Sequence, residues 1–333
     1  MSVLIKMAEA ADSIAIVGHI RPDGDCIGSC LAAYNYLTEQ YPEKEVAVYL
    51  QPPAKRFGYL ANIEQISQSV DDARVYDLCI CLDSGDVERL GENAVYYEHA
   101  VHTICIDHHI TNPGYGEVNI VEPQASSASE VLYGLLEPDQ ISKAVAECIY
   151  TGILHDTNVF KNSNTTGKTM MIAGKMMEKG INFSKIIDES FYQKTYVQNQ
   201  ILGRALLESV VFQHGKCIFT AVRKADMQFY GVDSNDLEGI VDQLRVTEGV
   251  ECAIFISETA NHEYKVSMRS NAFLDVSKVA AYFGGGGHIR AAGCTLAGTV
   301  HDVINNLSTQ IERQLKERDD GPLLRTCSEE GDE

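Results

Sequence analysis

An acid and two histidines stand side by side at Asp107, His108 and His109, directly after the apolar run Val101 to Cys105. Such a run predicts a buried strand, and three metal-capable side chains at its end are hard to explain by packing. The pattern therefore indicates a metal site. Two adjacent histidines after a strand point in different directions, so at most one is expected to bind the same ion as its neighbours. The other is free to donate to a phosphate.

A second group of metal-capable residues lies at His19, Asp23 and Asp25, just after the apolar segment Ser13 to Val17. The spacing H-x3-D-x-D offers one nitrogen and two carboxylate ligands on a tight turn. This mixture suits Mn²⁺ or a similar divalent ion better than Ca²⁺, which prefers oxygen alone. The alternative is that Asp23 or Asp25 caps the helix that follows.

Two further acids follow apolar segments. Asp83 ends the run Asp77 to Leu82, although acids at strand ends often only cap loops. Asp156 ends the helix-like segment Ser142 to Leu154, where the helix dipole disfavours a carboxylate, by less than about 1 kcal/mol, unless a cation compensates. With the two acids of the second group, they supply enough charge to neutralise two divalent cations. Two ions bridged by one carboxylate, roughly 3.5–4 Å apart, can activate a shared water. The four groups together predict a metal-dependent hydrolase.

A different signal is the glycine run from Gly284 to Gly287, which His288 and Arg290 follow. Backbone N–H groups of glycines can approach a phosphate closely, and the two basic side chains can add charged donors. Arg269, which closes an apolar strand, is expected beside them. The alternatives are a flexible loop for the glycine run and an exposed strand end for Arg269.

The segments predict an α/β fold in two parts. In the first part, near-continuous apolar strands alternate with helices, which is typical of a parallel sheet covered on both faces. Ligands of such sheets bind beyond the carboxyl ends of the strands, where the four acidic groups would meet. The expected strands are Ser13–Val17, Glu45–Leu50, Asp77–Leu82, Val101–Ile106 and Val118–Val121. The expected helices are Gly24–Gln40, Ser126–Leu136, Ser142–Leu154 and Thr165–Lys179.

The second part predicts a smaller α/β domain with a mixed sheet. Its expected strands are Lys216–Val222, Glu251–Ser257 and Tyr264–Arg269, and its expected helices are Ser234–Val241, Val276–Tyr282 and Val300–Lys316. The expected domain limits are 1–185 for the metal-binding catalytic domain, 186–209 for a helical linker, 210–318 for the substrate-binding domain and 319–333 for an acidic disordered tail.

The composition excludes several classes of protein. A formal net charge of −20 over 333 residues argues against binding long duplex nucleic acid, but it leaves room for a small anionic substrate in a local pocket. No apolar stretch reaches 18 residues and no signal-peptide pattern is present, so no membrane partner is expected and the predicted location is cytoplasmic. The ten cysteines are scattered, and for Cys26 and Cys30 core packing is favoured over a thiolate metal site.

In these motifs and their order, the chain resembles the DHH phosphoesterase superfamily, named for the triplet that is Asp107-His108-His109 here. The resemblance covers residues 10–317 and includes the glycine run ending in His288. Within the superfamily the chain is similar to the two-domain nanoRNase/pAp-phosphatase type, and not to the larger RecJ exonucleases. The resemblance implies a cleft between the two domains, closure across it, and a homodimer.

The resemblance also implies a role for each motif residue. One Mn²⁺ would be held by His19, Asp23 and Asp83, and the other by Asp25, Asp83, His108 and Asp156, with Asp83 bridging. His109 would contact the scissile phosphate, and Asp107 would orient a histidine. The predicted substrate-binding residues of the second domain are Arg269, Gly285, Gly286, Gly287, His288 and Arg290.

The expected reaction is hydrolysis of short oligoribonucleotides to mononucleotides, or of 3′-phosphoadenosine 5′-phosphate (pAp) to AMP. A phosphodiesterase for cyclic dinucleotides or for the linear dinucleotide pApA is the nearest alternative, and the motifs do not separate the two. A metal-free nucleotide sensor is a different class, which the intact ligand set disfavours. One departure concerns the base. Asn158 replaces a glycine frequent in the family, and the segment Phe160-Lys161-Asn162 keeps only one of two aromatics, so the base preference stays open.

Overall fold

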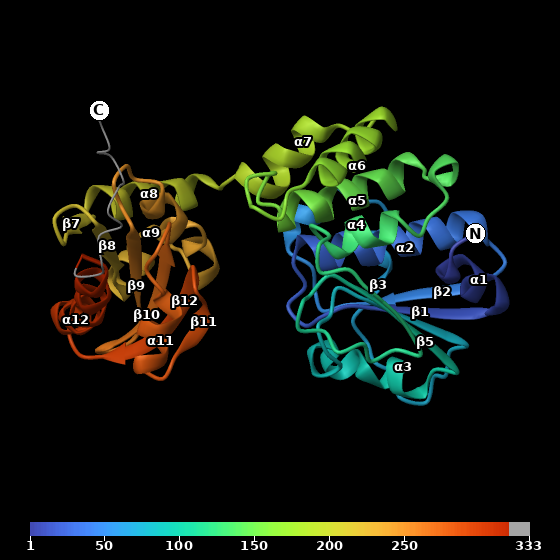
Figure 1. Cartoon of the computed structure of the whole chain (residues 1–333), viewed down its shortest axis with the longest axis horizontal. Coiled ribbons are helices and arrows are strands. Elements are labelled where there is room, and N and C mark those ends of the chain that lie inside the picture. The colour runs from blue at the N-terminus through green and yellow to red at the C-terminus, as the bar shows by residue number, and fades with distance from the viewer. Residues whose placement is uncertain (320–333) are drawn as a thin grey trace, which may run out of the picture. The chain divides into compact units, whose positions relative to one another are not determined.

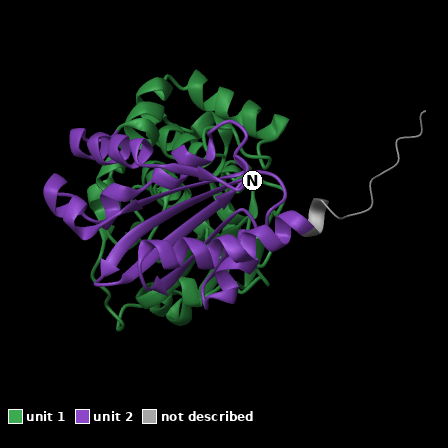
Figure 2. Cartoon of the chain, turned by 90° about the vertical axis from the view of Figure 1, so that its left-hand side faces the viewer, with its two compact units in different colours: residues 1–193 green, residues 194–333 purple. Residues whose placement is uncertain are grey.

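The computed structural model describes residues 1–319, with side chains up to residue 316. Of the acidic tail expected at 319–333, residues 320–333 therefore lie outside the described part of the chain. The chain divides into two compact units, Met1–Gln193 and Lys194–Glu333 (Figures 1 and 2). This boundary falls within the segment expected to be the linker. Each unit has its own six-stranded sheet and its own hydrophobic core.

The first unit is built on a parallel sheet with the strand order β3-β2-β1-β4-β5-β6. The strands are β1 (Ser13–Val17), β2 (Glu45–Tyr49), β3 (Ile66–Ser67), β4 (Leu78–Leu82), β5 (His102–Asp107) and β6 (Val118–Val121). All the strands expected in this half are present, and only β3 was not foreseen. Because β1 pairs with both β2 and β4, the direction of strand addition reverses between β1 and β4. Ligands of open α/β sheets bind at such a reversal.

Helices cover both faces of this sheet (Figure 1). The α-helices are α1 (Val3–Ala10), α2 (Gly24–Gln40), α3 (Ala94–His99), α4 (Ala128–Tyr133), α5 (Lys143–Asp156), α6 (Gly167–Glu178) and α7 (Phe183–Ile187). Short 3₁₀ helices span Lys55–Phe57, Ile63–Gln65, Glu88–Asn93 and Pro138–Gln140, and a π-helix spans Asp188–Tyr192. Helices α2 and α5 approach each other closely at Gly28, where an added Cβ would lie only 2.6 Å from the carbonyl oxygen of Cys148. On the opposite face α3 packs its Tyr96 ring on Tyr49, with ring centroids 4.0 Å apart.

The second unit contains a mixed sheet with the order β11-β12-β10-β9-β8-β7, in which only the β8–β9 pair is parallel. The strands are β7 (Val210–Phe212), β8 (Cys217–Val222), β9 (Cys252–Ala260), β10 (Glu263–Ser270), β11 (Gly286–His288) and β12 (Ala291–Ala297). The helices are α8 (Tyr196–Leu207), α9 (Lys224–Tyr230), α10 (Ile240–Arg245), α11 (Val276–Tyr282) and α12 (Val300–Asp319), with a 3₁₀ helix at Ser234–Leu237. Among the described helices, none is both long enough and apolar enough to cross a membrane.

Several details of the second half differ from the expectation, since β7, β11, β12 and α9 were not foreseen. The single helix expected at Ser234–Val241 is wrong, because Gly239 adopts φ 84° and separates the 3₁₀ helix from α10. Glycine takes this left-handed conformation without the steric cost that a Cβ would bring. The glycine run is also more ordered than the flexible-loop alternative assumed, since Gly286–His288 forms β11 and pairs with β12.

Candidate metal centre and phosphate-binding groove

The six predicted metal ligands gather at the carboxyl edge of the first sheet, around the reversal between β1 and β4. His19 follows β1, Asp83 follows β4, His108 follows β5, Asp23 and Asp25 open α2, and Asp156 ends α5. These side chains come from four separate stretches of the chain, and their imidazole and carboxylate atoms form overlapping groups within 4 Å of one another.

Asp83 lies between the two histidines. Its Oδ2 is 3.5 Å from His19 Nε2, and its Oδ1 is 3.6 Å from His108 Nε2. The side chain is 3% exposed, and the residue has φ 54°, a conformation that costs energy for a residue with a Cβ. A buried carboxylate that turns one oxygen to each histidine has the geometry of a bridging ligand.

The first half of the site consists of His19 and Asp23. His19 Nδ1 faces the carbonyl oxygen of Ile20 at 2.8 Å, so it donates there and leaves Nε2 for a ligand. Asp23 Oδ1 lies 3.7 Å from that Nε2 and also accepts from the backbone N–H groups of Asp25 and Cys26. Asp23 therefore does cap α2, and the same carboxylate still faces His19.

Cys26 is a neighbour that the sequence did not assign to the site. Its sulfur, His19 and Asp83 offer ligand atoms within 4.8 Å of one another. Burial raises the pKa of the Cys26 thiol well above its ordinary value, with Cys30 adding to the effect. Cys26 is fully buried and belongs to the hydrophobic core of the first unit, which supports the packing role that was expected.

The second half of the site surrounds His108. Its Nε2 lies 3.3 Å from Asp156 Oδ2 and 4.0 Å from Asp25 Oδ2. Asp25 is fully buried, and helix α4 orients it, since the backbone N–H groups of Ala128 and Ser129 donate to its two oxygens at 2.6 and 3.0 Å. This contact could not be predicted from local patterns, because Asp25 and Ala128 are 103 residues apart in the chain.

The charges of this cluster fit a divalent cation site. Burial raises the pKa of Asp25 well above its ordinary value, and Asp83 and Asp156 raise it further. Burial also raises the pKa of Asp156 to about 7. Buried carboxylates that repel one another in this way, with imidazole nitrogens among them, form a donor set that a divalent cation neutralises. Mixed nitrogen and oxygen donors suit Mn²⁺ and similar ions.

Asp107 and His109 form a separate hydrogen-bonded pair. Asp107 Oδ1 lies 2.8 Å from His109 Nδ1 and accepts from the backbone N–H of His108, while Oδ2 accepts from Asn112. Burial alone would raise the pKa of Asp107, but the bonds from His109 and Asn112 outweigh it and lower the pKa. A charged carboxylate can only accept, so His109 Nδ1 donates. The same bond raises the pKa of His109, which favours a cationic ring whose Nε2–H is left for a ligand.

Strained backbone follows Asp156. Asn158, Val159 and Phe160 adopt φ of 51°, 59° and 60°, which is unusual for consecutive residues with side chains. The Thr157 hydroxyl stabilises the run, donating to the carbonyl of Ile153 and accepting from Phe160 N. Two hydrogen bonds of Thr157 thus hold the segment that departs from the family pattern, directly after the predicted ligand Asp156.

In the second unit, Arg269 and the glycines Gly285 to Gly287 line one groove of about 760 Å³. Arg269 Nε lies 3.3 Å from Asp242 Oδ1. A Cβ on Gly285 would lie 2.2 Å from the Gly293 carbonyl oxygen, and one on Gly287 2.5 Å from that of Ala291. A Cβ on Gly286 would meet no atom within 4 Å. Gly285 and Gly287 are therefore needed for close packing, and of these three glycines Gly286 is the one with open space above its backbone.

Arg290 is engaged elsewhere in the second unit. Its guanidinium donates to the carbonyl oxygens of Ala272 and Leu274, in the loop between β10 and α11. The buried carboxylate of Glu251 accepts the backbone N–H groups of Ala272, Phe273 and Leu274 in the same loop. Neither Arg290 nor His288 is among the residues that line the groove.

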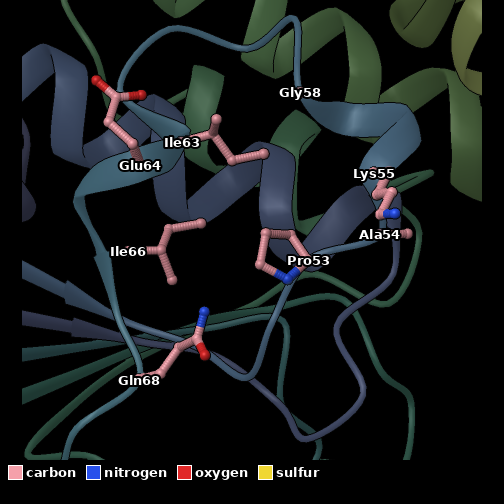
Figure 3. A pocket seen from close by; sticks show the side chains of 8 residues that line it. All are labelled: Pro53, Ala54, Lys55, Gly58, Ile63, Glu64, Ile66 and Gln68. Carbon is pink, nitrogen blue, oxygen red and sulfur yellow. The ribbon is translucent and has the colours of Figure 1, made fainter.

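A smaller hollow, of about 260 Å³, lies in the first unit near the loop after β2 (Figure 3). Its lining includes Pro53, Ile63 and Ile66 together with the charged residues Lys55 and Glu64, and contains none of the predicted site residues.

Comparison with known proteins finds two family matches, one within each of the two compact units. A family model described as the DHH family, N-terminal domain, matches residues 13–153, and a DHHA1 domain model matches residues 215–317. A Thermus thermophilus protein named bifunctional oligoribonuclease and PAP phosphatase NrnA is 30% identical over 302 residues, which cover 90% of this chain and 89% of that protein. The Bacillus subtilis protein of the same name is 26% identical over 298 residues, covering 88% and 92%. The crystal structure of an exopolyphosphatase-related protein from Bacteroides fragilis has a TM-score of 0.85 at 27% identity and covers 95% of this chain and 96% of its own.

Proposed function

Since the chain belongs to the DHH family and is a phosphoesterase, we propose that it hydrolyses short oligoribonucleotides to mononucleotides and pAp to AMP. Support comes from the two NrnA relatives, whose shared name joins an oligoribonuclease to a PAP phosphatase and whose similarity extends over both units. In both reactions water adds to phosphorus, the ester P–O bond breaks, and the leaving sugar oxygen takes up a proton.

The position of Asp83 between His19 and His108 is the observation that carries the proposal. We assign His19, Asp23 and Asp83 to one divalent cation and His108, Asp25, Asp156 and Asp83 to a second, with Mn²⁺ as the proposed ion. Bound there, the cations would neutralise charge on the phosphate and activate the attacking water.

The remaining residues bind and orient the substrate. His109 donates from Nε2 to a phosphate oxygen, and Asp107 holds its ring in that orientation. Arg269 and the backbone at Gly286 bind a second phosphate, with His288 as a further donor. Arg290 supports this region by tying down the loop at Ala272 to Leu274.

A substrate panel tests the proposal. The full-length protein is stripped with a chelator, reloaded with Mn²⁺, Mg²⁺ or Co²⁺, and assayed on pAp, pApA, a tetraribonucleotide and cyclic di-AMP. With Mn²⁺ the wild type is expected to turn over pAp and the linear oligonucleotides. Asp83→Asn should lose this activity. The control Asp86→Asn, which changes an exposed acid in the same loop, should keep it. Faster turnover of cyclic di-AMP than of any other substrate would favour the cyclic dinucleotide alternative. Intact pAp and oligonucleotides with every ion would overturn the proposal.

A further inference from the structure

The groove in the second unit extends well beyond Arg269 along the sheet. Its floor includes the residues of β10 and β12 that point away from α11 and α12. In β10 these are Glu263, Lys265, Ser267 and Arg269, and in β12 they are Ala291, Gly293 and Thr295. The alternate residues Tyr264, Val266 and Met268 are buried in the core on the other face. We name this surface the β10–β12 groove.

The groove exists because helices cover this face of the sheet only in part. Over β9, the side chains Ala253 and Phe255 on the same face are buried in a core with residues of α8 and α10. Over β10 and β12 the floor instead carries small residues between its charged ones, with Ser267 paired to Gly293 and Arg269 paired to Ala291. The glycines from Gly284 to Gly287 also line the groove. Its volume of about 760 Å³ is in the range of sites for whole small molecules.

The charges on the floor follow a pattern that suits a polyanion. Arg269 and Lys265 lie on the same face of β10, four residues and therefore about 14 Å apart along the strand. Ser267 lies between them, and Glu263 follows Lys265 at the far end, where the Thr259 hydroxyl donates to its carboxylate. The floor thus carries two cations, of which Arg269 is paired with Asp242 at 3.3 Å, in a chain with a net charge of −20.

Resting on the proposed function, we infer that the β10–β12 groove binds the sugar-phosphate backbone of an oligonucleotide. Arg269 and Lys265 contact different phosphates of the same strand, and Glu263 ends the tract by repelling the next one. The two phosphates of pAp are attached to one ribose, whereas the backbone positions of Arg269 and Lys265 lie about 14 Å apart along β10. A mononucleotide held by Arg269 therefore does not reach Lys265, whereas a longer strand does. Lys265 thus distinguishes oligonucleotides from pAp.

Kinetics of Lys265→Gln test this inference in the full-length protein with Mn²⁺. The expected result is a several-fold higher KM for a tetraribonucleotide, an unchanged kcat, and unchanged kinetics with pAp. Lys224→Gln, which removes an exposed lysine of the same unit outside the groove, should leave both substrates unaffected. Glu263→Gln should raise the rate on a hexaribonucleotide relative to the tetraribonucleotide.

Binding without turnover gives a second measurement. The affinity of a fluorescent tetraribonucleotide is measured in chelator at several salt concentrations. Each phosphate contact with a single strand contributes about 0.7 to the slope of log affinity against log salt, so Lys265→Gln should lower that slope by about 0.7.

The outcomes separate the two proposals. If the wild type cleaves neither pAp nor the tetraribonucleotide, the proposed function fails, and the salt slope still tests the groove. If it cleaves both and Lys265→Gln changes KM equally for the two substrates, or for neither, the inference is overturned. An unchanged salt slope overturns it as well.

Discussion

Asn112 Nδ2 donates to Asp107 Oδ2 over 2.6 Å, which ties the loop after β5 to a carboxylate with no exposed surface. Replacing Asn112 with alanine leaves this oxygen without its donor, which costs about 1–3 kcal/mol of unfolding free energy. Asp107 also positions His109, so kcat should fall as well. Urea unfolding and steady-state kinetics measure the two effects. The control is Asn306→Ala, which replaces an exposed asparagine on α12. Wild-type stability and wild-type kcat in Asn112→Ala would contradict the prediction.

Asp83→Asn should reduce the number of divalent ions bound as well as the rate. An amide carries no charge and offers only one oxygen, so it cannot face both His19 and His108 as the carboxylate does. We expect fewer than the wild-type number of Mn²⁺ ions per chain by elemental analysis after dialysis. Asp86→Asn should retain the full number, and an equal metal content in the two variants would remove Asp83 from the bridging position.

Binding of divalent ions should release protons and become tighter as pH rises. Burial alone would lower the pKa of His108, but the hydrogen bond with Asp83 and the charges of Asp25 and Asp156 outweigh it and raise the pKa to about 10. The metal-free ring is therefore protonated at neutral pH, and only its neutral form binds a metal. Titration calorimetry with Mn²⁺ in Hepes and in Tris counts the protons released. The idea fails if affinities at about pH 6.5 and about pH 8.5 agree.

Two neighbouring glycines should respond differently to alanine. Gly285→Ala brings its Cβ to 2.2 Å from the Gly293 carbonyl oxygen and should cost about 1–3 kcal/mol of stability. Gly286→Ala meets no atom within 4 Å, so its stability should stay near that of the wild type. Its methyl group would nevertheless occupy the space through which a phosphate approaches the backbone, and KM for pAp should rise. A wild-type KM in Gly286→Ala would show that no phosphate binds there.

The main features of the fold could be predicted because the signals are local. Runs such as Leu78–Leu82 are apolar throughout and are followed by an acid, so both the parallel sheet and the edge that carries the acids follow from the pattern. The grouping of His19, Asp83 and His108 follows from the same rule, since each side chain comes within two residues of the end of a strand.

Contacts between distant segments could not be predicted in this way. Nothing in the sequence near Asp25 indicates that backbone N–H groups of α4 donate to it. Nothing near Glu251 indicates that its carboxylate accepts from the loop at Ala272 to Leu274. The β11–β12 hairpin was also missed, because glycine has a low strand propensity and the pairing depends on close approach of two backbones. Such features depend on the tertiary structure, which local patterns do not specify.

The loop at Ala272 to Leu274 has no regular secondary structure, yet Glu251 accepts its N–H groups and Arg290 binds two of its carbonyl oxygens. In deuterated solvent its amides should therefore exchange as slowly as those of the neighbouring strands, unlike those of an ordinary surface loop. Side chains provide here the protection that a neighbouring strand provides elsewhere in the sheet.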